Sequence, residues 1–445
     1  MTILKQTYQG YVLPALEYGM AAWGSCSNNQ LEKLNKVHNQ GLRMITGAVK
    51  STPIADMETL TGLQSLPERR DSKVLAQYAK IKSQRHQPLH KRAKNNKTRR
   101  LKRSHFIDNA QKIEENLKLQ DVNVVETANI TSISPPWEEN KLPTIITHVK
   151  GISSKQQNER EQLKQIATDY IEKLFLKTEL TKVYTDRSAR DAITDGGAGI
   201  HAEWPDARTM SISIPGGRWC NNYRAEALAI QEAAKALMEE EDTYNSQIVF
   251  LSDAKSVLDA LRNPKNTELN DLRLALIKLR ETAKEVTLQW IPGHCDIEGN
   301  EKADTLAKSG AESMQFENLV TLEEKKTAIR ASVRNQWHER HPKFKREDPI
   351  HKLERANQVQ IFRLRTGHNL LRDHMFRTFK IGNTATCECG QEPENAEHVL
   401  QRCLRYDEQR TAVWPGGAPL REKLYGDLEE LGRTVMFLRQ IGLRL

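Results

Sequence analysis

The chain has 445 residues, enough for about three domains of ordinary size. Hydrophobic residues make up 38% of the chain and charged residues 28%, a balance that excludes a membrane protein and, over the whole length, an intrinsically disordered one. The formal net charge of +9 indicates a polyanionic partner without saying where that partner binds.

The charge is unevenly distributed along the chain. Residues 1–180 carry 28 basic and 18 acidic side chains, residues 181–312 carry 16 and 22, and residues 313–445 carry 23 and 18. An acidic block between two basic flanks favours an enzyme that gathers carboxylates around cations over a protein that only coats nucleic acid. The alternative is that surface charge varies by chance between domains, and the counts alone do not exclude it.

The sequence shows neither a secretory signal nor a run of about 18 apolar residues. We therefore expect a soluble, intracellular protein without membrane contact, in the nucleus or the cytoplasm. Six cysteines are too few for a disulfide scaffold in a chain of this length.

The first third of the chain divides into three predicted segments. Apolar spacing predicts a helical segment over residues 1–83 and a connecting helix within residues 154–178. Between them, residues 84–153 are polar and contain proline pairs, which is typical of a linker. Ten Lys or Arg and no acid lie between Lys82 and Arg103, a run that serves equally well as a solvated tether or as a nucleic-acid contact.

Residues 179–312 show the clearest alternation of element types. Short runs rich in β-branched residues predict three consecutive strands near residues 182–186, 198–204 and 209–214, followed by a helix over 221–241. Strand-like runs at 248–253 and 286–291 then alternate with helical segments. We expect an α/β fold, in which a mixed sheet is covered by helices on both faces and is flanked by helical segments.

Four acids in this domain occupy the ends or inner faces of the predicted elements: Asp186, Glu226, Asp253 and Asp304. Taken singly, each has an ordinary explanation as a helix cap, a turn residue or an exposed acid. Taken together, they match what Mg²⁺ requires, since several carboxylates on neighbouring elements can hold two ions about 3.5–4 Å apart around a phosphodiester.

The motifs that contain these acids resemble, in order, those of the ribonuclease H family, over about residues 181–312: VYTDRSA, NNYRAEALAI, FLSDAKSVLDAL and WIPGHCDIEGNEKADTLAK. The resemblance implies a five-stranded mixed sheet and hydrolysis of the RNA strand of RNA–DNA hybrids with two Mg²⁺ or Mn²⁺ ions. It also assigns roles residue by residue, with metal binding to the four acids Asp186, Glu226, Asp253 and Asp304, proton transfer to His294, and contact with the RNA 2′-hydroxyl to Asn222.

One residue departs from the family pattern. Most members have glycine after the first aspartate, whereas this chain has Arg187. Glycine there permits a close backbone approach that arginine does not reproduce, although arginine can contact a phosphate. We expect cleavage to survive at a reduced rate.

The C-terminal segment, residues 313–445, is basic and contains a Cys/His cluster of the form C-x-C-x8-H-x4-C. Three thiolates and an imidazole make a tetrahedral Zn²⁺ ligand set, here Cys387, Cys389, His398 and Cys403, although one residue between the first two cysteines is tighter than the usual spacing. The alternative is a group of reduced cysteines without metal.

Both flanks resemble non-LTR (LINE-type) retrotransposon polyproteins. The cluster after IFRLRTGHNLLRDHMFR is similar to their C-terminal Cys/His segment, residues 1–83 resemble the region after the reverse-transcriptase palm, and SPPW resembles their linker before ribonuclease H. No F/Y-x-D-D box occurs in the sequence, so we expect no DNA synthesis.

The leading hypothesis is a retroelement-derived, metal-dependent endoribonuclease that acts on RNA–DNA hybrids. The first alternative is a retroelement-derived nucleic-acid-binding protein whose hydrolytic site is silent, and the second is an interaction module built on residues 313–445. The salt dependence of hybrid affinity separates the last from the others, because phosphate contacts weaken steeply with salt.

Overall fold

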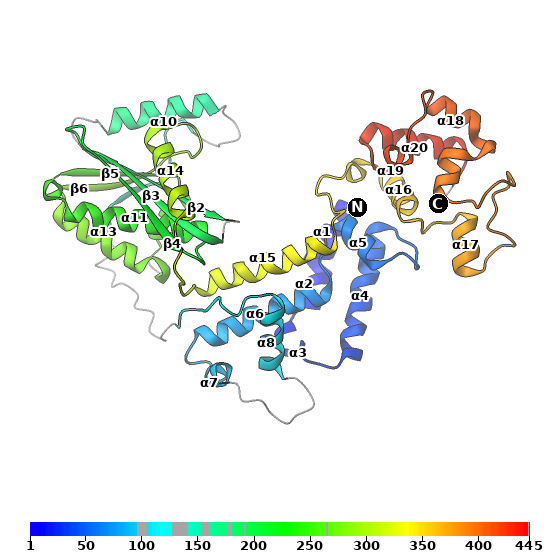
Figure 1. The fold of residues 1–445 in the computed structure, drawn as a ribbon, viewed down its shortest axis with the longest axis horizontal. Coiled ribbons are helices and arrows are strands. Elements are labelled where there is room, and N and C mark those ends of the chain that lie inside the picture. Colours follow the sequence, from blue (N-terminus) through cyan, green and yellow to red (C-terminus); the bar gives the residue numbers. More distant parts are fainter. Residues whose placement is uncertain are drawn as a thin grey trace. The chain divides into compact units, whose positions relative to one another are not determined.

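The structure, a computed structural model, describes residues 1–95, 105–126, 141–152, 160–175, 180–190, 193–244, 246–263, 266–443 and 445. It divides the chain into two compact units (Figure 1). The sheet unit comprises residues 78–99 and 114–329, and the flanking unit comprises residues 1–77, 100–113 and 330–445. Three of the boundaries fall inside helices: α6 (Leu66–Ser83), α8 (Phe106–Asn116) and α15 (Leu322–Arg340).

The sheet unit is built on one mixed sheet with the strand order β1-β6-β5-β2-β3-β4. Strands β2, β3 and β4 form an antiparallel meander, whereas β5 pairs parallel with both β2 and β6, and β1 pairs parallel with β6. The strand bounds are β1 (Thr144–Ile146), β2 (Thr181–Arg190), β3 (Thr194–Glu203), β4 (Thr209–Gly217), β5 (Gln247–Ser252) and β6 (Glu285–Trp290).

The mixed α/β class is confirmed, but the expected number of strands is wrong, because the sheet has six strands rather than five. The additional strand is β1, which comes from the range that the sequence predicted to be a linker. Its three residues pair in register with Thr287, Leu288 and Gln289 of β6. So short a strand carries too little alternation to be recognised from its own sequence.

Helices cover both faces of the sheet (Figure 1). Side chains alternate along β2, so that Val183 joins the core under one set of helices and Tyr184 joins the core under the other. The first set is α11 (Asn222–Glu239), α12 (Lys255–Leu261) and α13 (Asn270–Thr282), and the second is α10 (Arg160–Leu174) and α14 (Glu298–Glu312). Short 3₁₀ turns lie at Glu241–Thr243 and Thr267–Leu269.

Two glycines let α14 lie directly on the sheet. A Cβ at Gly199 of β3 would come within 1.9 Å of the backbone oxygen of Ala303, and one at Gly197 within 2.1 Å of the backbone oxygen of Ala307. The helix backbone therefore occupies the space that side chains would need. Because Asp304 follows Ala303, this close packing sets the position of a predicted metal ligand.

The range 84–153 contains more structure than the expected linker, over its described residues. It includes α7 (His90–Lys94), α8 and the strand β1. Glu114 forms a buried ion pair with Lys325, with 2.6 Å between Oε1 and Nζ, and Val124 pairs with Val320 in an isolated β-bridge. Part of the basic run and the SPPW motif lie outside the described residues.

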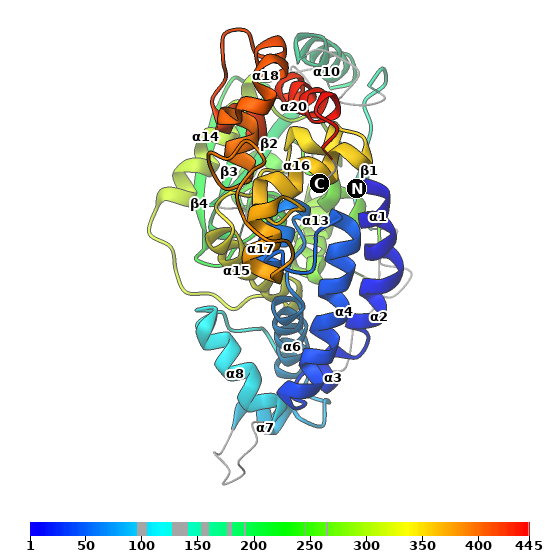
Figure 2. The same ribbon diagram turned by 90° about the vertical axis from the view of Figure 1, so that its right-hand side faces the viewer.

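The flanking unit is helical and combines the two ends of the sequence (Figure 2). Leu42, Ile45 and Met57 from the first segment share one core with Ile361 and Val435 from the last. Residues 1–77 and 330–445 therefore belong to one unit, although the sequence predicts them to be separate segments.

Its N-terminal helical elements are α1 (Thr2–Thr7), a π-helix (Tyr8–Val12), α2 (Leu13–Glu17), α3 (Met20–Trp23), α4 (Asn28–Thr46) and α5 (Ile54–Thr61). Its C-terminal elements are a 3₁₀ turn (Pro349–Lys352), α16 (Arg355–Thr366), α17 (Arg372–Phe379), a π-helix (His398–Arg402), a 3₁₀ turn (Leu404–Tyr406), α18 (Asp407–Val413), α19 (Leu420–Tyr425) and α20 (Leu428–Gln440). Among the described residues, no helix is both long and apolar enough to cross a bilayer.

Candidate active site and metal centres

Asp186 lies in the middle of β2, opposite Gly199 of β3. Its side chain is buried on the same side of the strand as Tyr184, the face that α14 covers. The backbone N–H of Arg187 donates to Oδ1 at 2.7 Å, and Nδ2 of Asn300 donates to Oδ2 at 3.2 Å. These two donors fix the orientation of the carboxylate.

Glu226 enters the site from the first turns of α11. Asn221 caps this helix by accepting a hydrogen bond from the backbone N–H of Arg224 at 2.8 Å. Glu226 shares the inner face of the helix with Ile230 and Leu237, so it is buried, with 3% of its surface exposed. Its Oε2 atom is buried and has no hydrogen-bond partner among the described residues. An unsatisfied carboxylate oxygen of this kind is costly unless a cation occupies the site.

Asp253 follows β5 directly and is half-buried. The loop after β6 passes so close that a Cβ at Gly293 would lie 1.8 Å from Asp253 Oδ2. A Cβ at this position would displace the Asp253 carboxylate, and glycine avoids this. The next residue, His294, is exposed and adopts φ +58°, so it follows directly after the point where the loop meets Asp253.

The three carboxylates form a compact group. Asp186, Glu226 and Asp253 each offer an oxygen, and these oxygens lie within 4.8 Å of one another. Burial, with the neighbouring negative charge of Asp253, raises the pKa of Asp186 to about 7. Burial, with the charges of Asp253 and Asp186, raises the pKa of Glu226 well above its ordinary value. The chemistry of the donors therefore fits a hard divalent cation, which stabilises the ionised form of all three groups.

Arg187 contacts this cluster. Its Nε atom lies 3.3 Å from Oε1 of Glu226, and its side chain is about one-third exposed. The guanidinium lowers the pKa of Glu226 and Asp186, against the larger effects of burial and of the other acids. The residue that departs from the family pattern thus supplies a positive charge inside the proposed metal site.

Two further predicted site residues, Asp304 and Asn222, lie on α14 and α11. Asp304 forms an ion pair with Lys308, one turn later on α14, and it is not part of the compact group of three. It remains close enough for its charge to raise the pKa of Asp186. Asn222 is the half-buried first residue of α11, four residues before Glu226.

Two residues of the site were not singled out from the sequence. Asn300, which donates to Asp186, lies four residues before Asp304, so helical spacing places both on one face of α14. This four-residue spacing is the sequence signal from which Asn300 could have been predicted as a site residue. No local pattern indicates that Gly293 lies against Asp253, because the contact joins two segments far apart in the sequence.

The C-terminal cysteines and histidine also converge, in the flanking unit. The Sγ atoms of Cys387 and Cys403 lie 3.6 Å apart, and Sγ of Cys389 lies 3.2 Å from Nε2 of His398. All four ligand atoms lie within 4.8 Å of one another. Gly390, at φ +77°, and a hydrogen bond from its N–H to the backbone oxygen of Cys387 form the turn that brings the first two thiols together.

The chemistry of this second group fits zinc. A backbone hydrogen bond from Gln391 lowers the pKa of Cys389 to about 7, whereas burial raises the pKa of Cys387 to about 12. A divalent cation favours the thiolate at both cysteines. Soft sulfur ligands with one imidazole suit Zn²⁺ and do not suit Mg²⁺.

Comparison with known proteins places the acidic site in a recognised domain. Residues 178–312 match the family model described as RNase H. Ribonuclease H1 from Mus musculus and its counterpart from Rattus norvegicus are each 29% identical to this chain over 133 residues. The match covers 26% of this chain and 45% of each relative, so the chain spans less than half the length of the curated relatives it matches.

Similar solved structures include the RNase H1 of the halophilic archaeon Halobacterium salinarum NRC-1, at 21% identity with a TM-score of 0.25, covering 29% of this chain and 96% of that one. A second is LC9-RNase H1, described as a type 1 RNase H with the type 2 active-site motif, at 21% identity with a TM-score of 0.26, covering 35% of this chain and 85% of that one.

Proposed function

We propose that the protein is a metal-dependent endoribonuclease that hydrolyses the RNA strand of RNA–DNA hybrids. The observation that carries this proposal is the buried group Asp186, Glu226 and Asp253, whose oxygens converge within 4.8 Å inside the segment that matches the RNase H family. The mouse and rat relatives are named ribonuclease H1, which supports the same reaction.

In this proposal Asp186, Glu226 and Asp253 hold Mg²⁺ or Mn²⁺, with Asp304 at the edge of the site as a fourth acid. The bound cations supply Lewis acidity, both toward the attacking water and toward the leaving oxygen. Asn300 and the N–H of Arg187 orient Asp186, while Gly293 brings the loop with His294 beside Asp253. Water adds to phosphorus and the bond to the 3′-oxygen breaks, which leaves 5′-phosphate and 3′-hydroxyl ends. His294 is proposed to move the proton, and Asn222 to contact a 2′-hydroxyl.

The test compares cleavage of a labelled RNA–DNA hybrid, duplex DNA and duplex RNA by the full chain in the presence of Mg²⁺. We expect cleavage of the RNA strand of the hybrid alone, and none by Asp253→Asn, which keeps the size of the side chain and removes its charge. Hybrid cleavage by Asp253→Asn at the rate of the original protein would disprove the proposal.

A second candidate, a nucleic-acid-binding protein with a silent hydrolytic site, is favoured by the contact between Arg187 and Glu226. A guanidinium that already neutralises one ligand competes with a divalent cation for it. The remaining acids and His294 favour the active enzyme. The affinity of the site for a divalent cation, with and without the Arg187 side chain, therefore decides between the two candidates.

Replacing Arg187 with glycine is expected to strengthen metal binding by about tenfold, which corresponds to about 1.4 kcal/mol of binding free energy. The reason is that the substitution removes the ion-pair partner of Glu226, so the cation no longer competes with the guanidinium for this carboxylate. The Mg²⁺ concentration that gives half-maximal hybrid cleavage should fall by a similar factor. Mn²⁺ affinity, measured by calorimetry without substrate, checks the prediction independently of catalysis.

The matched control is Arg190→Gly, which removes the same charge from the same strand, where Arg190 pairs with Asp195 away from the acidic cluster. This control should leave the Mn²⁺ affinity unchanged. Weaker metal binding by Arg187→Gly would contradict the prediction.

We further propose that Cys387, Cys389, His398 and Cys403 hold a structural Zn²⁺ ion and that the protein derives from a non-LTR retroelement. The first proposal is supported by the four convergent ligand atoms. The second is supported by the resemblance of both flanks to such polyproteins.

A further inference from the structure

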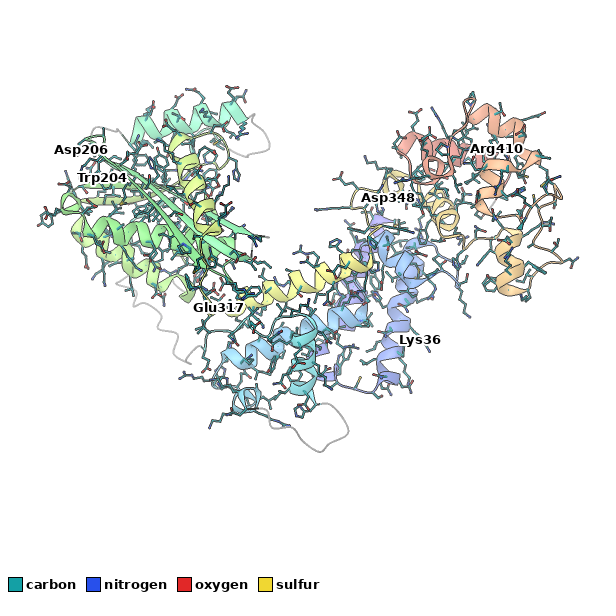
Figure 3. All side chains as sticks on the ribbon, in the orientation of Figure 1. Lys36, Trp204, Asp206, Glu317, Asp348 and Arg410 are labelled. Carbon is teal, nitrogen blue, oxygen red and sulfur yellow. The ribbon has the colours of Figure 1, made fainter. Side chains whose placement is uncertain are left out.

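A cavity of about 720 Å³ lies within the flanking unit, apart from the acidic site and the Cys/His cluster. Its wall is formed by α5, α16, α19 and the segment that follows α15, so both ends of the sequence are needed to build it. Figure 3 labels Asp348, which lies at this cavity, and Lys36 on α4 of the same unit. Cavities of this volume are typical of ligand-binding sites.

Three basic side chains at the cavity are exposed and free for a ligand. Lys343 and Lys345 come from the segment after α15, and Arg421 comes from α19. None of the three forms an ion pair within the described part of the chain. Asp56 on α5 is an opposing charge at the wall, so the free charges still favour an anion.

A fourth cation, Arg365, is already paired within the protein, and its contacts stabilise the wall of the cavity. It forms a two-pronged ion pair with Asp348, at 2.7 and 3.1 Å, and donates from Nε to the backbone oxygen of Leu424 at 2.6 Å. Its guanidinium also lies 4.5 Å from the centre of the Tyr425 ring. These contacts fix Tyr425 at the cavity, although 45% of its surface is exposed.

We propose that this cavity binds single-stranded nucleic acid. Lys343, Lys345 and Arg421 contact successive phosphates, and a base stacks on Tyr425, the combination of cations and aromatic rings that single strands require. The proposal extends the proposed function, because it gives the flanking unit a nucleic-acid contact of its own. An acidic peptide would use the same cations but would gain nothing from the ring face.

The experiment measures the binding of a fluorescein-labelled 12-nucleotide oligouridylate to the full chain, in Mg²⁺-free buffer, as a function of salt. We expect Lys343→Ala/Lys345→Ala/Arg421→Ala to weaken binding at least tenfold and to reduce the slope of log affinity against log salt by about 2, since each contact with a single strand contributes about 0.7. Tyr425→Ala should weaken binding by about tenfold, and Tyr425→Phe should not, because the stacking surface is kept.

A change of opposite sign sharpens the test. Asp56→Asn removes the opposing charge, so it should strengthen binding by about threefold. The matched control, Lys33→Ala/Lys36→Ala/Lys50→Ala, removes three exposed charges from the same unit away from the cavity and should bind as the original protein does. Equal affinities for the two triple variants, or weaker binding by Asp56→Asn, would overturn the proposal. Binding of a polyglutamate peptide in preference to the oligonucleotide would also overturn it.

Failure of this proposal is distinguishable from failure of the proposed enzyme activity. Asp253→Asn should lose hybrid cleavage and bind the oligonucleotide normally. A protein that cleaves hybrid but shows no difference between the triple variants retains its enzyme function and lacks the strand site. A protein that cleaves nothing but shows the predicted binding changes retains the strand site and lacks the activity.

Discussion

Replacing Asp186 with asparagine is expected to abolish hybrid cleavage, by at least about 10³-fold, and to stabilise the metal-free protein. The loss of activity follows from the loss of a charged ligand at the centre of the acidic group. The gain in stability follows because asparagine resembles the protonated carboxyl, which the folded state prefers. Oδ1 of Asn300 is buried without a partner among the described residues, and after rotation of its amide it accepts a hydrogen bond from the new side chain.

The pH dependence of stability checks this explanation. The pKa of Asp186 rises from an ordinary value of 3.8 to about 7 in the folded protein. The contribution of Asp186 to the free energy of unfolding is fully present below about pH 4, where the folded and unfolded chains both hold the proton. It is lost as the pH rises from about 4 to about 7, because in this range the unfolded chain releases the proton and the folded chain keeps it. Above pH 7, in the absence of metal, Asp186→Asn should be more stable by roughly 2–4 kcal/mol.

Urea unfolding of both proteins between pH 4 and pH 8, without divalent cations, measures this difference. Asp259→Asn is the matched control, since Asp259 is an exposed acid of the same unit on α12. It should change neither activity nor the pH profile. Equal stability of the original protein and Asp186→Asn at pH 8 would show that the acidic group is not under electrostatic strain.

Removing zinc is expected to unfold the segment around residues 387–403 and to cost the flanking unit several kcal/mol. Cys387, His398 and Cys403 are buried, and a zinc ion would join the turn at Cys387 to the π-helix that begins at His398, which otherwise meet through ion pairs between exposed side chains. Metal analysis should find one Zn²⁺ per chain. After chelation, hydrogen exchange should accelerate across residues 385–405 and stay unchanged across β5.

Cys389→Ser should reproduce the effect of chelation, because it removes one ligand. Cys26→Ser is the control, since Cys26 lies in the same unit and outside the cluster. Purified protein that holds no zinc and shows the same exchange before and after chelation would contradict the structural zinc site.

Much of the sheet unit was predictable because its signals are local. Runs rich in β-branched residues in β2 and β5, and the apolar face of α11, predicted the element types, and the acids within these motifs predicted the site. Asp186, Glu226 and Asp253 do converge. The predicted fourth ligand, Asp304, lies outside the compact group and pairs with Lys308, and the order of the motifs does not determine such side-chain contacts.

The remaining features depend on contacts between distant segments. The three residues of β1 form a strand only because β6 offers an open edge. The contact of Arg187 with Glu226 was missed because arginine can also reach a phosphate, and only the packing of α11 against β2 decides between them. The shared core of residues 1–77 and 330–445 joins segments more than 250 residues apart, beyond any periodicity.

That shared core has a consequence for the order in which the protein is made. Leu42, Ile45 and Met57 leave the ribosome long before Ile361 and Val435, with which they pack. At about 5–20 residues per second, synthesis of the intervening chain takes roughly 15–60 s. During that interval the sheet unit can fold around its own core, while the N-terminal helices expose apolar surface. The nascent chain is therefore most vulnerable to aggregation, and most dependent on chaperones, in its first 77 residues.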